Sequence, residues 1–213
     1  MGLFLAASAF RDSDVDPVTM ALERFLADHD WSSDDEARPA DEVCLFAPVD
    51  GWTVVLWPPY FNGHDAVAAR HISHTLGTLA STVHIYDGDY WVHRLFRAGE
   101  ELDRSASTPA YWAEFDEDAS RLRAAWTGDA AVVANAVGRA PEGVEPYLTP
   151  LTDADEPPGK AFEDDEFELD DPWVLVDFWR RLGIAYPADS TASAHRLSLQ
   201  PGWLKQLPTD GEL

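Results

Sequence analysis

The sequence predicts an α+β protein with a mostly antiparallel sheet of about six strands, helices on one face, and a helical C-terminal part. Two Asp-Gly pairs, Asp50-Gly51 and Asp87-Gly88, each separate two apolar runs. An Asp-Gly pair in this setting is a strong hairpin signal, because a type I′ turn needs positive φ angles at both central residues. Two other segments carry apolar residues at helical spacing, which indicates amphipathic helices between the strands.

The expected elements of the first half run strand, helix, strand, strand, helix, strand, followed by two more strands. The strands are expected at residues 2–10, 42–49, 52–57, 82–86, 89–96 and 101–104, and the helices at 17–28 and 64–80. The first six elements have the β-α-β-β-α-β order of ferredoxin-like folds, and the remaining strands extend the sheet as a meander. A two-residue turn at Asp87-Gly88 would place Ile85 opposite Tyr90 and Val83 opposite Val92.

The pattern becomes mainly helical after about residue 108. We therefore expect residues 1–108 to form the sheet domain and residues 109–213 to form a helical extension packed on it. Helices are expected near 119–126, 129–137 and 172–182, with a short strand at 195–199. Residues 152–172 contain ten acidic side chains and one lysine, so we expect an exposed acidic connector there, which Phe162, Phe167 and Leu169 could attach to the body.

The composition excludes several classes of function. The chain has 213 residues, of which 46% are hydrophobic, and a formal net charge of −24. Such a charge repels phosphate groups, so we expect no nucleic-acid partner and no anionic membrane surface. Cys44 is the only cysteine, which excludes an intramolecular disulfide and a cysteine-based zinc site. The apolar start is short and lacks a basic leader, so a cytoplasmic protein without a membrane span is expected.

Three histidines are the first candidates for chemistry. His64, His71 and His74 share the expected helix over residues 64–80 and could lie on one flank of it. Together with a nearby carboxylate they could form a metal site, although their spacing is not that of the His-Glu-x-x-His zinc pattern. We expect ordinary histidines at the edge of the helix, no metal and no cofactor, and keep the metal site as the alternative.

Candidate partner-binding residues come from two segments. Residues 57–63 combine aromatic side chains with two prolines, and Tyr60 and Phe61 could form a stiff binding loop or close the edge of the core. Asp164, Asp165 and Glu166 stand in the middle of the acidic connector. Acidic side chains of this kind could guide the encounter with a basic protein.

Residues 80–112 resemble a block found in uncharacterised bacterial proteins. The block has an acidic turn, aromatic-rich strands, the return Gly99-Glu100-Glu101-Leu102-Asp103-Arg104, and then Ser107, Pro109 and Tyr111-Trp112. The resemblance implies no known chemistry. Small acidic bacterial proteins of this style are similar to the immunity proteins of toxin systems.

Two hypotheses of function follow. The first is a non-enzymatic protein that binds another, basic protein, in the manner of an immunity-type inhibitor. It depends on the net charge of −24, on the acidic segments 32–42 and 152–172, and on the absence of nucleophile motifs from the sequence. The alternative is a metal-assisted enzyme with a histidine-rich site around residues 64–93.

Overall fold

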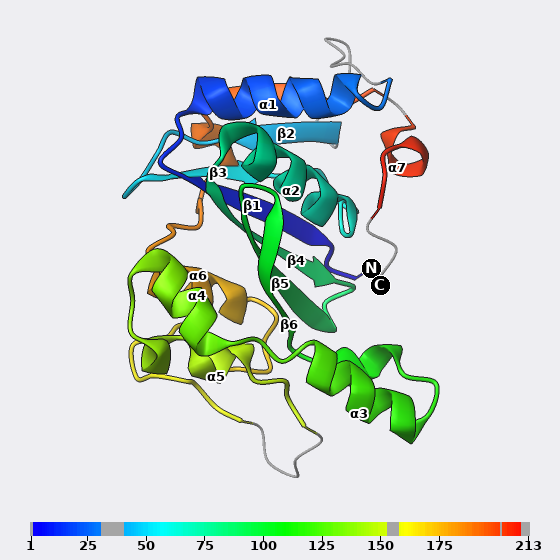
Figure 1. Ribbon diagram of the computed structural model, residues 1–213, viewed down its shortest axis with the longest axis vertical. Helices are drawn as coiled ribbons and strands as arrows, with labels where there is room; N and C mark the ends of the chain where they lie inside the picture. Colours follow the sequence, from blue (N-terminus) through cyan, green and yellow to red (C-terminus); the bar gives the residue numbers. More distant parts are fainter. Residues whose placement is uncertain (1, 31–40, 153–157, 201, 210–213) are drawn as a thin grey trace.

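A seven-stranded antiparallel sheet organises the molecule, which confirms the α+β prediction; its seventh strand is the short strand expected at 195–199. Figure 1 shows the computed structural model, which describes residues 2–30, 41–152, 158–200 and 202–209. The strand order is β6-β5-β4-β1-β3-β2-β7. The strands are β1 (Leu5–Arg11), β2 (Glu42–Leu45), β3 (Trp52–Leu56), β4 (Leu79–Tyr86), β5 (Tyr90–Arg97), β6 (Glu100–Ala106) and β7 (His195–Ser198).

The centre of the sheet has the ferredoxin-like arrangement expected from the element order. Helix α1 (Val15–Ala27) leads from β1 to β2 past the intervening strand β3, and α2 (His64–Leu76) leads from β3 to β4 past β1. Each helix therefore connects two strands that are parallel to each other and separated by an antiparallel neighbour. Strands β5 and β6 extend the sheet from β4 as the expected meander.

Helix α2 is shorter than the predicted span of residues 64–80. It ends at Leu76 because Gly77 adopts a left-handed φ of 65°. The amide of Thr78 then donates to the carbonyl of Ser73 at 3.1 Å, which closes a Schellman-type end. The released chain starts β4 at Leu79, so β4 has eight residues where the sequence predicted five.

The hairpin between β4 and β5 differs from the prediction by one residue. Asp87 and Gly88 form the expected positive-φ turn, closed by a 2.9 Å hydrogen bond from Asp89 N to Tyr86 O. Asp89 is nevertheless left over as an extra residue, so Ile85 pairs with Trp91 instead of Tyr90. Because the side-chain period of a strand is two, this shift exchanges the faces on which the residues of β5 lie.

The sheet has a hydrophobic core on each side. On one side α1 and α2 cover large buried side chains, among them Phe10, Phe25 and Ile72. On the other side Val83, Ile85 and other sheet residues pack against α4 (Ala130–Val137), α5 (Glu145–Leu148) and α6 (Val174–Leu182). Figure 1 shows α1 and α2 in the upper part of the view and α4, α5 and α6 at the lower left. The first two helices thus share one face, as predicted, and α4, α5 and α6 of the second half cover the other.

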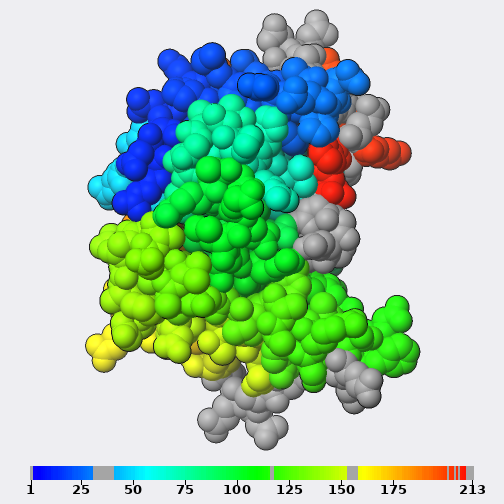
Figure 2. Space-filling model, in the orientation of Figure 1, coloured from blue at the N-terminus to red at the C-terminus, as the bar shows by residue number. Residues whose placement is uncertain are grey.

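A third, smaller cluster lies at the β5–β6 end of the sheet. Here Tyr90, Val92 and Ala106 pack against Trp126, with Trp112 and Leu122 at their border. The flanking helices are the 3-10 helix η2 (Pro109–Trp112) and α3 (Asp116–Ala125). In Figure 2 the green segment that contains α3 projects from the lower right of the body.

The second half of the chain returns to the sheet rather than forming a separate body. Strand β7 pairs with β2, and Trp203 of α7 (Trp203–Gln206) packs against Phe61 in the core beneath α1 and α2. The second half of the chain therefore contributes a strand to the sheet and side chains to the core beneath α1 and α2. Residues 158–172 of the acidic connector also pack on the body, through Phe162, Phe167 and Leu169. The acidic segments 31–40 and 153–157 lie outside the described residues.

None of the helices in the described part of the chain is both long enough and apolar enough to cross a lipid bilayer.

Ile85→Ala should lower the free energy of unfolding by roughly 2–4 kcal/mol, because Ile85 is fully buried between the sheet and α6. Leu102→Ala is the control, since Leu102 is 36% exposed on the edge strand β6, and it should cost less than about 1 kcal/mol. Urea unfolding of both variants measures the difference. Equal losses would show that Ile85 is not buried in the core on this face of the sheet.

Candidate partner-binding surface

A row of aromatic rings crosses one end of the sheet on the face that carries α2. Consecutive rings have centroids between 4.6 and 5.4 Å apart. Three of the rings are well exposed, and a buried tyrosine supports them from below. We call this surface the aromatic strip; its members are Phe4, Tyr60, Tyr86, Tyr90, Tyr111 and Trp112.

The register of the sheet explains why three of these rings line up. Strands β1, β4 and β5 are neighbours, with Ala6 paired to His84 and Tyr86 paired to Tyr90. Phe4 and Tyr86 each lie two residues beyond the pair Ala6–His84, so both point to the face of α2. The ring of Phe4, directly before β1, therefore stands beside Tyr86 of β4, and Tyr86 stands beside Tyr90 of β5, as in other cross-strand aromatic pairs.

Tyr60 joins the strip from the loop between β3 and α2. Its backbone has a φ of 68°, a left-handed conformation that is uncommon for a bulky residue. The loop is fixed by Asn62, whose amide donates to the carbonyls of Leu5 and Ile85. Tyr60 is 48% exposed and its ring lies 4.6 Å from that of Phe4. A conformation of this kind persists only where the surrounding structure enforces it, and such residues cluster at binding sites.

Carboxylates border the strip. Asp87 and Asp89 stand exposed in the turn between Tyr86 and Tyr90. Hydrogen bonding to Asp89, together with its charge, raises the pKa of Tyr111, which is 55% exposed. Burial raises the pKa of Tyr90 to about 12. The surface thus combines neutral, hydrogen-bonding phenols with negative charge, and this combination suits a cationic side chain.

The predicted aromatic pair divides between core and surface. Phe61 is fully buried and stacks on Trp57 with a centroid distance of 4.5 Å, so it closes the edge of the core. We therefore withdraw Phe61 from the partner-binding residues. Tyr60 is exposed and lies beside Phe4 in the aromatic strip, so it remains a candidate partner-binding residue.

Asp165 of the acidic connector is directed inward. It is 4% exposed and accepts hydrogen bonds from Tyr147 Oη at 2.7 Å and from the amide of Phe162 at 3.0 Å. Arg180 and Arg181 donate to its other oxygen at 3.0 and 2.6 Å. Burial, reinforced by the hydrogen bond to Asp165, raises the pKa of Tyr147. Asp165 therefore attaches the connector to α5 and α6.

The two neighbours of Asp165 differ from it. Asp164 is exposed but is held by Arg180 and Arg181, and the hydrogen bonds from these arginines lower its pKa to about 2. Glu166 has an exposed side chain, while its amide donates to Asp177 at 2.8 Å. Of the three acids predicted to meet a partner, Glu166 is the one whose carboxylate faces solvent without a recorded ion pair.

The three histidines of α2 are directed to three different parts of the molecule. His64 Nδ1 lies 3.0 Å from the carbonyl of Pro208, and His74 Nδ1 lies 3.2 Å from that of Ala98. His71 faces α1, 4.0 Å from Asp28, and burial lowers its pKa. Within the described ranges, no group of three or more His, Cys, Asp or Glu side chains is placed to hold a metal ion.

A buried Asp–His pair lies under α2, within residues 64–93, the region of the alternative histidine-rich site. Asp65 and His84 are 1% and 2% exposed, and His84 Nδ1 lies 3.1 Å from Asp65 Oδ1. Burial alone would raise the pKa of Asp65, but His84 and the hydrogen bonds from Thr82 and Gly63 lower it instead. The pair resembles those used in acid–base catalysis, yet its burial keeps solvent away. We interpret it as part of the core.

Comparison with known proteins adds no family to this description. Neither family models nor curated proteins nor solved structures gave a match to the chain.

Asp165→Ala should destabilise the protein by roughly 3–5 kcal/mol, because it would leave the hydroxyl of Tyr147 and the guanidinium of Arg181 without their shared buried acceptor. Glu166→Ala, one residue further on, should change the free energy of unfolding by less than about 0.5 kcal/mol. Thermal and urea unfolding of the two variants provide the measurement. A mild effect at Asp165 would return that residue to the candidate partner surface.

Asp103→Asn should stabilise the protein near neutral pH. Asp103 accepts a 2.7 Å hydrogen bond from the amide of Asp129, while its Oδ2 is buried without a hydrogen-bond partner. Burial raises its pKa from 3.8 to about 6, although the hydrogen bond from Asp129 opposes the shift. The folded state therefore binds the proton more tightly, and this stabilisation is lost as the pH rises through 6.

We expect the asparagine variant to gain roughly 1–2 kcal/mol over the natural chain at pH 7. The gain should disappear below pH 4, where Asp103 is protonated in both the folded and the unfolded state. Urea titrations at pH 3.5, 5, 6 and 7.5 test this. A difference between the two chains that is independent of pH would contradict it.

Proposed function

We propose that this chain is a non-enzymatic binding protein that takes a basic protein partner on the aromatic strip. The observation that carries the proposal is the exposure of three phenol rings in one aromatic row at an end of the sheet: 48% for Tyr60, 40% for Tyr86 and 55% for Tyr111. Tyrosine is enriched at the energetic centres of protein interfaces, where its ring gives contact area and its hydroxyl gives hydrogen bonds.

The charge of the chain supports a basic partner. The sequence holds 39 acidic side chains against 15 lysines and arginines, and Asp87 and Asp89 place carboxylates directly beside the exposed rings. Arginine and lysine side chains bind well to aromatic faces next to carboxylates. Acidic charge elsewhere on the surface would speed the approach of such a partner at low salt.

An immunity-type role belongs to the same proposal. Residues 80–112, which resemble a block of bacterial proteins, supply Tyr86, Asp87, Tyr90 and Tyr111 of the surface. A protein that neutralises a basic toxin needs a rigid surface of complementary charge and needs no catalytic group of its own. The residues proposed here meet that requirement. The metal-assisted enzyme has no comparable support, since the histidines of α2 diverge.

The partner can be caught at the strip itself. A photoreactive phenylalanine analogue in place of Tyr111 should crosslink one basic protein in the source cell. The same analogue in place of Met20, which is 68% exposed on α1, should not crosslink it. Binding of the purified partner should weaken at least tenfold in Tyr60→Ala and in Tyr111→Ala. Met20→Ala should bind as the natural chain does.

Measurements of the association rate and of the affinity distinguish the effect of the charges from that of the direct contacts. Asp87→Asn with Asp89→Asn should slow association, and added salt should slow it further in the natural chain, because charges beyond about 8 Å are screened at physiological salt. Tyr60→Gly keeps the left-handed backbone without strain, so it should fold at least as well while losing affinity. A partner that binds Tyr60→Ala and Tyr111→Ala normally, or one that is acidic, would refute the proposal.

A further inference from the structure

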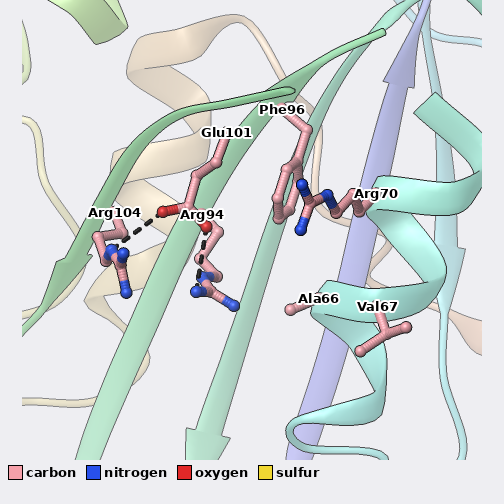
Figure 3. Close-up of a pocket in the computed structure, with 7 residues that line it drawn as sticks. All are labelled: Ala66, Val67, Arg70, Arg94, Phe96, Glu101 and Arg104. Carbon is pink, nitrogen blue, oxygen red and sulfur yellow. Dashed lines mark ion pairs between the residues drawn. The ribbon is translucent and has the colours of Figure 1, made fainter. Parts of the chain in front are cut away.

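A cavity of about 320 Å³ lies on the face of α2, between that helix and strands β5 and β6. Its walls carry both apolar and charged side chains. The strands contribute Arg94, Glu101 and Arg104, and α2 contributes Ala66, Val67 and Arg70, as Figure 3 shows. The lining residues are Ala66, Val67, Arg70, Arg94, Phe96, Glu101 and Arg104.

A β-bulge builds the polar wall. Arg94 of β5 pairs directly with Arg104 of β6, and like charges in this position repel each other. The register then shifts between Leu95 and Phe96, so that Leu102 has no opposite residue and Glu101 pairs with Phe96. Glu101 and Arg104, three residues apart, are thereby placed on the same face of the sheet.

Glu101 bridges the two arginines of the sheet. Its carboxylate oxygens lie 3.0 Å from Arg94 and 2.9 Å from Arg104. Trp126 lies against both guanidinium groups, with centroid distances of 5.7 and 5.3 Å, which fixes them in place. Arg94 is 7% exposed, so its charge is held within the protein at the wall of the cavity.

The third arginine comes from the helix. Arg70 Nε donates to the carbonyl of Gly99 at 2.9 Å, which anchors the guanidinium over the β5–β6 turn. Figure 3 shows the side chain extending from α2 toward Phe96. The lining therefore carries three guanidinium groups and one carboxylate, within a chain whose net charge is −24.

We propose that this cavity binds a small organic monocarboxylate. The carboxylate would lie against Arg70, whose forked N–H groups match its geometry. The apolar part of the ligand would lie along Ala66, Val67 and Phe96. Glu101 favours a singly charged ligand, because a phosphate dianion would meet stronger repulsion from the glutamate.

The size of the cavity agrees with this class of ligand. A volume of about 320 Å³ is at the lower end of small-molecule sites, which suits an acid with a single ring or a short chain. The site is separate from the aromatic strip in its residues. Loss of one binding activity therefore leaves the other to be measured.

Benzoate is the probe, and its neutral isostere benzamide and inorganic phosphate are the comparisons. The signal is the indole N–H resonance of Trp126, assigned by its disappearance in Trp126→Phe. Benzoate should shift this resonance saturably in 0.15 M salt. Benzamide and phosphate should each bind at least tenfold more weakly.

Arg70→Gln should weaken benzoate binding about tenfold, because one charged, forked donor is removed. Arg24→Gln is the matched control, since Arg24 is also an exposed arginine on a helix but lies on α1, and it should leave the affinity unchanged. The proposal is overturned if benzoate gives no saturable shift up to about 10 mM, a limit near the weakest affinity expected for so small a ligand. Equal binding of benzamide, preference for phosphate, or equal effects of the two arginine variants would also overturn it.

Discussion

A chain of buried hydrogen bonds crosses the centre of the sheet and fixes its register. Trp57 Nε1 donates to Ser8 Oγ at 2.8 Å, and Ser8 Oγ lies 2.8 Å from Thr82 Oγ1. Thr82 in turn donates to Asp65, which holds His84. This series of hydrogen bonds joins the end of β3 to β1, β4 and α2. Slipping any of these strands by one residue would leave buried polar groups unpaired, and each such group costs about 1–3 kcal/mol.

Both candidate surfaces depend on this register. The aromatic strip exists because β1, β4 and β5 bring Phe4, Tyr86 and Tyr90 to the same face at the same end of the sheet. The arginine-lined cavity exists because a second irregularity, the bulge at Leu102, brings Glu101 beside Arg104. An extra residue in a turn, Asp89, and an extra residue in a ladder, Leu102, thus redirect side chains at the two places where we infer binding. Bulges are frequent beside functional sites for this reason.

The sequence predicted the elements better than their contacts. Asp-Gly turns and helical spacing are local signals, so they were sufficient for the hairpins, for α1 and for the start of α2. The leftover Asp89 has no local signature, which is why the facing residues of β4 and β5 were mispaired. Asp165 looked like an exposed acid because its partners, Tyr147 and Arg181, are distant in the sequence. Such pairings depend on the tertiary fold, and composition does not reveal them.

The same distinction bears on the net charge of −24. Some of the carboxylates serve the fold: Asp65 holds His84, Asp165 holds two arginines, and Glu101 bridges two more. The net charge by itself therefore does not identify a partner surface, because it includes the carboxylates that bind other residues of the protein as well as the exposed ones. What distinguishes Asp87 and Asp89 is their position beside exposed phenol rings on a rigid turn. Charge speeds the association of two proteins, but only a surface that also offers apolar contact can slow their dissociation.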